Sequence, residues 1–527
     1  MGMKVLIADA IAPEGVERLT SAGIEVVDGS GWSREELIER IGQFDGLIVR
    51  SATRVDAALI AAATRLRVVG RAGVGVDNID VEAATKRGIV VINSPEGNTV
   101  STAEHTIAMI GALARRIPQA HAALVRDGKW ERSRFTGVQL AGKVLGVIGL
   151  GRVGSEVARR AMALEMRVIA YDPFISEERA KRLGVQLTTV EEICRQADFI
   201  TVHTPLTRQT ENLIGQEQFA LMKPGVHIIN CARGGIIDEE ALYNAIVEGK
   251  VAGAALDVFV AEPPQGNPLL TLEQVIATPH LGASTREAQV GVAVDVAEAV
   301  ARALFGRPVK YAVNAPALRE EEGDALGTYV QLAERVGHFV THAFDGNFSR
   351  LEIRYRGEAA RFDDAALTSG LLKGMLEPIL HDQVNYVNAR VLAEERGIRI
   401  AVTKENGSQP SGGSISVTTT GGPRTRSVTG AADNRGIFIT EIDGYPVNIS
   451  PQGRVLVAYN VDKPGIIGRV GTLLGDHGVN IAYMQVGRKE VGSYAVMVLG
   501  IDDPLDNHVL AKLQAMEDLK DVRLVEW

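Results

Sequence analysis

The sequence predicts an α/β protein with two doubly wound parallel-sheet domains, followed by an α+β domain and a ferredoxin-like βαββαβ domain. Three observations support this fold class. Short apolar runs alternate with amphipathic stretches over residues 4–93 and again over 143–277, which is typical of parallel βα units. A Gly-x-Gly-x-x-Gly turn opens the second series. From residue 454 onward, the pattern is strand, helix, strand, strand, helix, strand.

The first βα series predicts strands at 4–9, 23–28, 44–50, 66–70 and 89–93, with helices at 33–41 and 56–63. A longer helix is expected over 99–116, ended by Pro118. It is apolar on more than one face, so we expect it to pack against something large. The first domain is assigned to residues 1–97 and 288–314 and is expected to bind the substrate.

The second series predicts strands at 143–148, 167–172, 199–203, 227–230, 254–258 and 274–277. This spacing is typical of a complete doubly wound nucleotide-binding domain, which we assign to residues 98–287. A helix over 287–305 then leads into a linker at 307–314.

The composition changes in the last two domains. Residues 315–453 contain helical patterns around 327–342 and 368–395, and a Gly, Ser and Thr cluster at 405–430 that predicts hairpins and loops. Residues 454–527 predict strands at 455–461, 481–488, 493–499 and 522–526, with helices at 467–477 and 507–516. We assign these stretches to an intervening α+β domain and a ferredoxin-like domain.

Length and composition limit the function classes. At about 150 residues per domain, 527 residues predict three to four domains. The 56 glycines exceed the usual share of about 7% and indicate many tight turns or close backbone approaches. With 5% aromatic residues and a formal charge of −9, the chain is not expected to bind nucleic acid.

Targeting signals are not visible. Two cysteines cannot build a disulfide framework. The apolar run near the N-terminus is too short for a signal peptide, and no uncharged apolar stretch reaches the ~18 residues of a membrane span. We expect a cytoplasmic protein without membrane contact and without a metal site.

The glycine-rich turn predicts a dinucleotide site because it follows a strand and opens a helix. Gly149 permits the tight turn, Gly151 lets backbone approach a pyrophosphate, and Gly154 lets helix and strand pack closely. Asp172 closes the next strand, where a carboxylate accepts hydrogen bonds from ribose hydroxyls and repels a 2′-phosphate. NAD is therefore favoured over NADP.

Three loops after later strands carry charged residues: 230–235, 257–264 and 278–282. Ligands bind at the carboxyl ends of parallel strands, so these loops are expected to meet. Arg233 could bind a carboxylate, His280 could accept a hydroxyl proton, and Glu262 could stabilise one tautomer of the histidine. The set suits oxidation of a 2-hydroxy acid with hydride transfer to a nicotinamide. Taken singly, a histidine is more often structural than catalytic, Glu262 could be only solvated, and Arg233 could be a surface charge.

These motifs resemble the D-isomer-specific 2-hydroxyacid dehydrogenases: Gly-Leu-Gly-Arg-Val-Gly at 149–154, Asn-Cys-Ala-Arg-Gly-Gly at 230–235, Asp-Val-Phe-Val-Ala-Glu-Pro-Pro at 257–264 and Thr-Pro-His-Leu-Gly-Ala at 278–283. The resemblance implies the catalytic set Arg233, Glu262 and His280. The cofactor-binding residues expected from the motif and the resemblance are Gly149, Gly151, Arg152, Val153, Gly154, Asp172, Thr204, Cys231, Ala232, Asp257, Gly282 and Ala283. Val74 stands where the family often has Thr, so a hydroxyl contact is lost there.

Residues 50–71 hold five arginines against one acid, which points to a phosphate on the substrate. Arg65 and Arg67 are expected to be solvated at the far end of a strand. The expected substrate residues are Arg50, Ser51, Arg54, Arg71, Gly73, Asn78 and Arg132. The resemblance implies D-3-phosphoglycerate as the substrate and places Arg132 or Arg134 in a neighbouring subunit's site.

The last domain resembles an ACT regulatory domain. The resemblance implies L-serine as the effector, and the polar residues beside the Pro464-Gly465 turn are Asn460, Asp462 and Asn480. An Asx-type turn without ligand is the alternative. In the intervening domain five basic residues could form an anion site or could be scattered surface charge: Arg354, Arg356, Lys373, Arg424 and Arg426.

Two further interpretations stay open. The same fold could act on another 2-hydroxy or 2-oxo acid, such as 2-oxoglutarate, or could be a corepressor-like protein that senses NAD. The 99–116 helix and the ACT-like domain both favour a homodimer or homotetramer.

Overall fold

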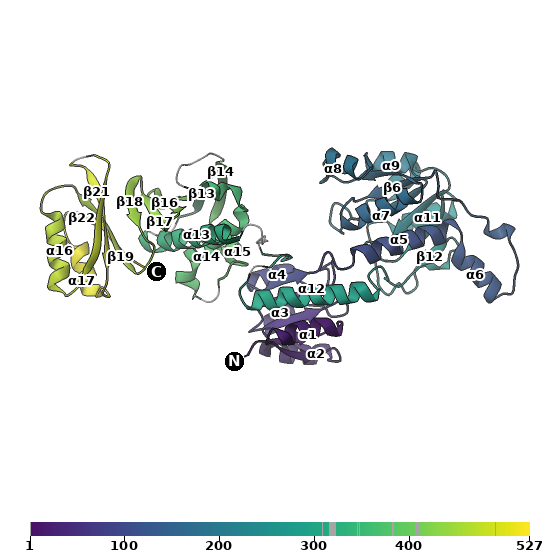
Figure 1. Cartoon of the computed structure of the whole chain (residues 1–527), viewed down its shortest axis with the longest axis horizontal. Coiled ribbons are helices and arrows are strands. Elements are labelled where there is room, and N and C mark those ends of the chain that lie inside the picture. Colours follow the sequence, from purple (N-terminus) through teal and green to yellow (C-terminus); the bar gives the residue numbers. More distant parts are fainter. Residues whose placement is uncertain are drawn as a thin grey trace.

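The computed structural model describes residues 2–307, 309–315, 323–344, 346, 348–381, 384–405, 412–490 and 492–527. The described chain forms four units in an elongated arrangement, with the nucleotide-type unit at one end and the C-terminal unit at the other (Figure 1). Two parallel sheets, one mixed sheet and one antiparallel sheet confirm the predicted fold class.

The first sheet has five parallel strands in the order β2-β1-β3-β4-β5. Its strands are β1 (Lys4–Ile7), β2 (Glu25–Asp28), β3 (Gly46–Val49), β4 (Val68–Arg71) and β5 (Val90–Asn93). Apolar residues of α2 (Arg34–Arg40), α3 (Ala57–Ala62) and α4 (Val81–Lys86) cover one face. The other face carries α1 (Pro13–Ser21) and, from far along the chain, α12 (Arg286–Leu304).

The second sheet has seven parallel strands in the order β12-β11-β10-β9-β6-β7-β8. They are β6 (Val144–Ile148), β7 (Arg167–Tyr171), β8 (Gln186–Leu187), β9 (Phe199–Val202), β10 (Val226–Asn230), β11 (Val251–Leu256) and β12 (Val275–Ala277). The order reverses between β6 and β9, which is where open α/β sheets bind ligands. The short edge strand β8 has no distinct sequence pattern and was not among the predicted strands.

Helices cover both faces of the second sheet. The helices α5 (Thr99–Ala114) and α7 (Arg152–Ala163) pack on one face with α8 (Glu177–Arg182). The opposite face carries α9 (Val190–Gln196), α10 (Gln216–Leu221) and α11 (Glu239–Val247).

The end of α5 differs from the prediction. The helix ends at Ala114, Arg116 takes a left-handed conformation at φ 50°, and Pro118 lies in the first turn of α6 (Ile117–Val125). Proline is well suited to a first turn because the missing N–H has no helical acceptor there. Pro118 therefore opens a second helix.

The intervening unit packs two helices, α13 (Gly323–Ala343) and α14 (Asp364–Leu380), on a mixed sheet. The strands are β13 (Arg350–Gly357), β14 (Arg399–Glu405), β15 (Gly413–Thr420), β16 (Arg426–Asp433), β17 (Gly436–Ile442) and β18 (Tyr445–Ile449). The predicted helical region 368–395 divides into α14 and α15 (Ala389–Glu395). Part of the predicted 405–430 loop region, residues 406–411, lies outside the described residues.

The C-terminal unit has the predicted βαββαβ order and an antiparallel sheet, β20-β21-β19-β22. Its elements are β19 (Arg454–Val461), α16 (Ile466–Asp476), β20 (Ile481–Arg488), β21 (Tyr494–Ile501), α17 (Asn507–Gln514) and β22 (Leu519–Glu526). One face of this sheet shares a continuous apolar core with the intervening unit. The two C-terminal units therefore pack as one body.

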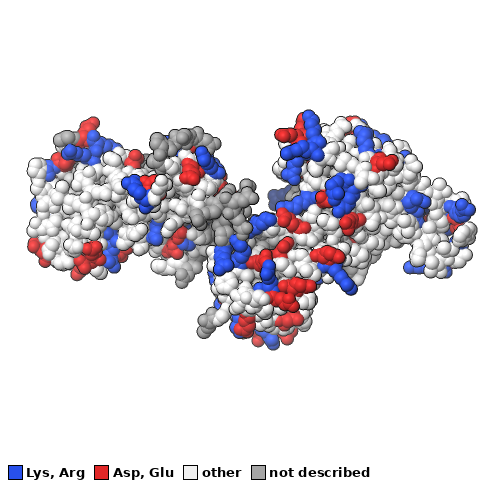
Figure 2. Space-filling view, in the orientation of Figure 1, with Lys and Arg blue, Asp and Glu red and all other residues white. Residues whose placement is uncertain are grey.

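The distribution of surface charge and the length of the helices are relevant to nucleic-acid and membrane partners. Figure 2 shows basic and acidic side chains interspersed over the parallel-sheet units on the face in view, with no continuous basic stripe there. Within the part of the chain that the structure describes, no helix combines the length and apolarity needed to cross a bilayer.

Candidate active site

The glycine turn between β6 and α7 has the geometry that its spacing predicts. Gly149 has a φ of +93°, and a Cβ on Gly154 would lie 2.0 Å from the Gly149 carbonyl oxygen. A Cβ on Gly151 would meet nothing within 4 Å, so backbone stays open to a ligand there. Asp172 accepts hydrogen bonds from Leu150 N at 2.8 Å and from Phe174 N at 2.8 Å, which fixes the turn against the next loop.

This contrast predicts different effects for two alanine substitutions. We expect Gly154→Ala to lower the free energy of unfolding by about 1–3 kcal/mol, because the methyl group would overlap backbone. Gly151→Ala should leave Tm unchanged but weaken NADH binding. Thermal denaturation and NADH fluorescence titration measure the two effects. A Gly154→Ala protein that melts like the wild type would contradict this close packing.

A cleft of about 480 Å³ lies between the two parallel-sheet units. Eight of the predicted cofactor residues line it: Arg152, Val153, Thr204, Cys231, Ala232, Asp257, Gly282 and Ala283. The Oγ1 atom of Thr204 and the Oδ1 atom of Asn98, also in the lining, are buried without a partner among the described residues. Buried polar atoms normally have partners, so these two fit a polar ligand such as a dinucleotide. Burial raises the pKa of the Cys231 thiol to about 12, so it stays protonated.

The predicted histidine and glutamate meet at the edge of this cleft. Glu262 Oε2 lies 2.8 Å from His280 Nδ1, which leaves Nε2 as the nitrogen that can take a proton. Glu262 Oε1 accepts from Phe259 N at 3.2 Å. Because a Cβ on Gly234 would lie 2.0 Å from the Phe259 carbonyl oxygen, only glycine lets the loops after β10 and β11 approach this closely.

Arg233 reaches from the second sheet toward the first. Its Nε donates to Asp77 Oδ2 at 3.2 Å across the cleft. Asn230 Nδ2 donates to the Arg233 carbonyl oxygen at 2.8 Å and holds this loop. Asp77 was not among the predicted site residues. Its place in the Gly-Val-Gly-Val-Asp segment was visible, but no pattern in the sequence pointed to Arg233 as its partner.

The structure brings three of the predicted cations together: Arg50, Arg71 and Arg233. Burial and the charges of Arg233 and Arg50 lower the pKa of Arg71 to about 10, while Asp77 and Asp9 act in the opposite sense. Cations that repel one another at close range are stabilised by an anion between them. Of the three, Arg233 lines the same cleft as His280.

The other predicted substrate residues have different surroundings. Arg54 and Ser51 are exposed, and among the described side chains no hydrogen bond or ion pair joins them to Arg71. Arg65 pairs with Asp45 at the opposite end of the strands, as expected of a solvated residue. A Cβ on Gly73 would lie 2.4 Å from Arg71 Nη1, so a side chain there would displace the guanidinium.

Asn78 acts as a support for the arginines. Its Oδ1 accepts from Arg71 Nε at 3.0 Å, and its Nδ2 donates to the carbonyl oxygens of Arg50 and Thr53 at 2.8 and 2.6 Å. Asp9, which the sequence did not single out, accepts from Arg50 N, Thr53 N and Thr53 Oγ1. Its position at the end of the first strand was the available signal. Together these residues shape the loop after β3.

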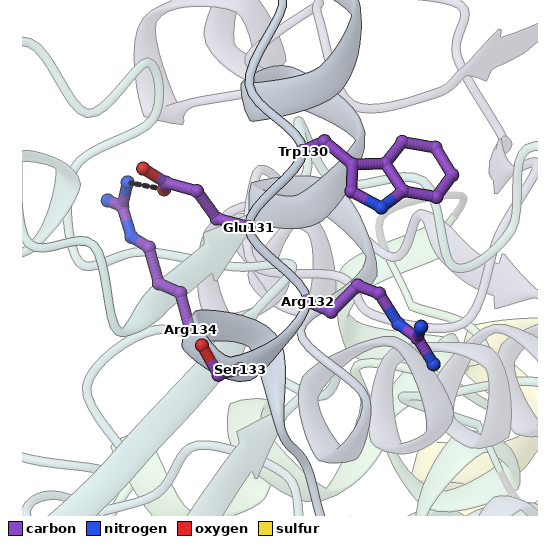
Figure 3. A pocket seen from close by; sticks show the side chains of 5 residues that line it. All are labelled: Trp130, Glu131, Arg132, Ser133 and Arg134. Atoms are coloured by element: carbon purple, nitrogen blue, oxygen red, sulfur yellow. Dashed lines mark hydrogen bonds and ion pairs between the residues drawn. The ribbon is translucent and has the colours of Figure 1, made fainter.

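Arg132 lies away from the cleft of its own chain. The segment that follows α6 projects at the outer end of the second unit (Figure 1). Figure 3 shows Trp130 and Arg132 projecting to one side of this segment, while Arg134 turns to Glu131 on the other. Trp130 is 78% exposed. Arg134 also pairs with Glu273 of the same chain at 2.9 Å.

The three predicted effector residues do not meet within one chain. Asn460 is buried with an unpartnered Oδ1, and Asp462 Oδ2 accepts from Gly492 N at 3.2 Å. Asn480 precedes β20, whose first residue pairs with Ile501, and Ile501 pairs with Arg454 at the other end of β19. The strand register therefore separates Asn480 from Asn460 by nearly the length of the sheet.

The basic residues of the intervening unit are paired with carboxylates. Arg354 and Arg356 share Glu405, and Lys373 contacts Glu334 and Glu377. The remaining pairs are Arg424 with Asp521 and Arg426 with Asp443. The structure does not bring the five together into one anion site.

A dinucleotide turn, a His–Glu pair and Arg233 meet at one cleft. This combination defines an NAD-dependent dehydrogenase of the D-isomer-specific 2-hydroxyacid class. Residues 107–282 match the family model described as "D-isomer specific 2-hydroxyacid dehydrogenase, NAD binding domain". Residues 325–440 match the "D-3-phosphoglycerate dehydrogenase intervening domain" and 454–518 the "ACT domain". The chain belongs to the D-3-phosphoglycerate dehydrogenase family, in its long form with intervening and ACT domains.

Full-length relatives and solved structures agree with this assignment. The chain is 46% identical over 524 residues to D-3-phosphoglycerate dehydrogenase of Methanocaldococcus jannaschii, covering 99% of each chain. It is 45% identical to the Bacillus subtilis enzyme of that name, again over 99% of both. A D-lactate dehydrogenase from Aquifex aeolicus, solved with NAD and lactic acid, superposes with a TM-score of 0.52 at 28% identity, covering 60% of this chain and all of that one.

Proposed function

We propose that this chain oxidises D-3-phosphoglycerate to 3-phosphohydroxypyruvate with NAD, the first step of serine biosynthesis. The observation that carries the proposal is that Arg233 shares one cleft with His280 of the His280–Glu262 pair, while the charges of Arg233 and Arg50 both act on Arg71. A substrate with both a carboxylate and a phosphate uses more of these cations than lactate or glyoxylate would. The curated relatives that span the chain carry the name of this activity.

Each side chain of the site would have its own role in the reaction. Arg233 would bind the substrate carboxylate, replacing Asp77 as the partner of its guanidinium. Arg50 and Arg71 would bind the phosphate. His280 Nε2 would take the proton of the C2 hydroxyl, and Glu262 would stabilise the imidazolium through Nδ1. NAD, held at Gly151, Arg152 and Thr204, supplies the hydride acceptor.

Steady-state formation of NADH from NAD and D-3-phosphoglycerate tests this function, with D-glycerate and D-lactate as comparators. We expect D-3-phosphoglycerate to be the preferred substrate. Efficient turnover of an unphosphorylated acid alone would contradict the substrate assignment. NADH oxidation with 2-oxoglutarate measures the alternative reductase activity, and NADH binding without any turnover would favour a sensor.

L-serine is the proposed effector at the ACT unit. Asp462 would hold the ammonium group, since its carboxylate is partly exposed and contacts only Arg488 and backbone at 3.2–3.5 Å among the described side-chain pairs. Asn480 would complete the site from a second copy, because the register separates it from Asp462 within one chain.

Asp462→Asn should abolish inhibition by L-serine while leaving the uninhibited kcat unchanged. The amide keeps the shape and a hydrogen-bond acceptor but loses the charge that an ammonium needs. NADH formation titrated with L-serine measures the effect. Asp476→Asn, at the exposed end of α16, is the matched control and should keep wild-type inhibition. Unchanged inhibition in Asp462→Asn would contradict the site.

A homodimer or homotetramer in the cytoplasm completes the proposal. Large apolar side chains stand exposed on α6 and the segment after it: Ile117, Leu124, Val125 and Trp130. Exposed apolar patches commonly mark protein interfaces. Arg132 lies in the same projecting segment and would reach the cleft of a neighbouring subunit. The two cysteines are free and buried, which suits a reducing compartment.

A further inference from the structure

One face of α5 binds the loop that carries His280. Ser101 Oγ lies 2.7 Å from Thr285 Oγ1, Thr102 Oγ1 donates to the Gly282 carbonyl oxygen at 3.3 Å, and His105 Nε2 lies 3.2 Å from Thr278 Oγ1. Residues i, i+1 and i+4 of a helix share one side, so the three contacts form a single stripe. This α5 clamp (Ser101, Thr102 and His105) holds both ends and the middle of the 278–285 loop.

His105 also contacts Asp257, the buried carboxylate under the same loop. Its Nε2 lies 3.2 Å from Asp257 Oδ1. Asp257 also accepts from Thr278 Oγ1 at 2.6 Å and from the backbone of Leu281 and Gly282 at 2.7 and 2.8 Å. The Thr278 hydroxyl donates its proton to Asp257, so Thr278 Oγ1 and Asp257 Oδ1 can only accept from His105. The imidazole Nε2 must therefore carry the hydrogen and donate to them.

The donors keep this carboxylate ionised. Burial raises the pKa of Asp257, but hydrogen bonds from His105, Thr278 and the loop backbone outweigh it and lower the pKa below its usual value. A buried carboxylate is tolerated only when such donors surround it. Each lost donor therefore weakens the support under the loop.

The backbone of His280 is strained. Its φ is +54°, and its N–H donates to the carbonyl oxygens of Asp257 at 2.9 Å and Thr278 at 3.0 Å. A non-glycine residue in this region costs on the order of 1–3 kcal/mol and keeps its conformation only where the surroundings impose it. Here Asp257 and its hydrogen-bond donors hold His280 in this conformation.

The clamp lies where the chain crosses between the two parallel-sheet units. Residues 94–98 precede α5, and α12 begins at Arg286 directly after the clamped loop. Ser94, in the first crossing, donates to Asp295 of α12 at 2.8 Å. The two crossings are thus tied together.

We propose that His105 is a positioning residue for His280, acting through Asp257 and Thr278 to hold the 278–282 loop in its strained conformation. The proposal rests on the proposed function, in which His280 takes the hydroxyl proton. His105 itself does not line the cleft and has no contact with the His280–Glu262 pair; it reaches the cleft lining only through Asp257.

The first test compares substitutions at His105. His105→Ala should lower kcat by about 10- to 100-fold, the loss typical of a reacting group displaced by about 1 Å, with KM for D-3-phosphoglycerate within about 3-fold of wild type. His105→Asn keeps an N–H donor and should recover most of the loss. Glu104→Gln, one residue away and paired with Arg160, is the control and should keep wild-type kcat. Rates are expressed per NADH-binding site, which removes any loss of folded protein.

A double-mutant cycle separates positioning from general damage. If His105 acts through His280, then His105→Ala should cause no further loss in a His280→Ala background. Independent losses that multiply would overturn the proposal, as would a wild-type kcat in His105→Ala. If His105→Ala does not fold, Thr278→Val removes the shared hydroxyl with little change of volume and should give the same non-additive pattern. The kcat of the wild type with D-3-phosphoglycerate tests the proposed function. The ratio of the variant's kcat to the wild-type kcat tests this inference, and it can be measured on whichever 2-hydroxy acid the enzyme oxidises.

Discussion

Replacing His280 with alanine should reduce kcat by about 10²- to 10⁴-fold, because the C2 hydroxyl loses the group that accepts its proton. Glu262 is not placed to take over, since it contacts Nδ1, the ring nitrogen that does not take the proton, and its Oε1 accepts from the Phe259 N–H. NADH affinity should stay within a few-fold of wild type, because the glycine turn and Thr204 are untouched.

Steady-state kinetics and NADH titration of the same protein sample measure both effects. His508→Ala, an exposed histidine on α17, is the control for a general effect of losing an imidazole. If His280→Ala kept wild-type turnover, another group would have to accept the proton. If NADH binding were lost with turnover, the loop geometry rather than proton transfer would explain the result.

Replacing Arg71 with glutamine should raise KM for D-3-phosphoglycerate by about 100-fold, since a charge-assisted hydrogen bond contributes about 2–3 kcal/mol and ~1.4 kcal/mol corresponds to tenfold. Arg71 is partly buried, and the charges of Arg233 and Arg50 act on it, so the phosphate that it is proposed to bind would be less screened by water there. The constants for D-glycerate, which lacks the phosphate, should change much less.

Arg65→Gln is the matched control for Arg71→Gln. It removes an arginine of the same cluster in sequence, but one that pairs with Asp45 at the opposite end of the strands. The control should leave both substrates unaffected. An equal loss for D-3-phosphoglycerate and D-glycerate in Arg71→Gln would show that Arg71 supports the carboxylate or the fold instead of the phosphate.

The sequence predicts most of the fold because periodicity and turn chemistry are local. The βα alternation of the first two units and the βαββαβ order of the last are present as described. The intervening unit was harder: β13, β17 and β18 were not predicted, because strand pairing there is set by partners distant in the chain. Pro118 was interpreted as a stop because its role as a first-turn residue depends on the left-handed Arg116 before it.

The site was predictable only in part. Loops at strand ends were correctly expected to bring Glu262 and His280 together. The partners that hold the charged groups were not predicted, since Asp9 and Arg50 or Asp77 and Arg233 are joined only by the folded topology. The wide separation of Asn480 from Asp462 follows from strand register, which the sequence pattern of a single domain does not reveal.

The ratio of kcat/KM for D-3-phosphoglycerate to that for D-glycerate tests the central claim most directly, because the two acids differ only in the phosphate that the Arg50 and Arg71 group is proposed to bind. Measured with NAD at saturating concentration, the ratio should exceed about 10² and should fall toward unity in Arg71→Gln. A wild-type ratio near unity would contradict the account.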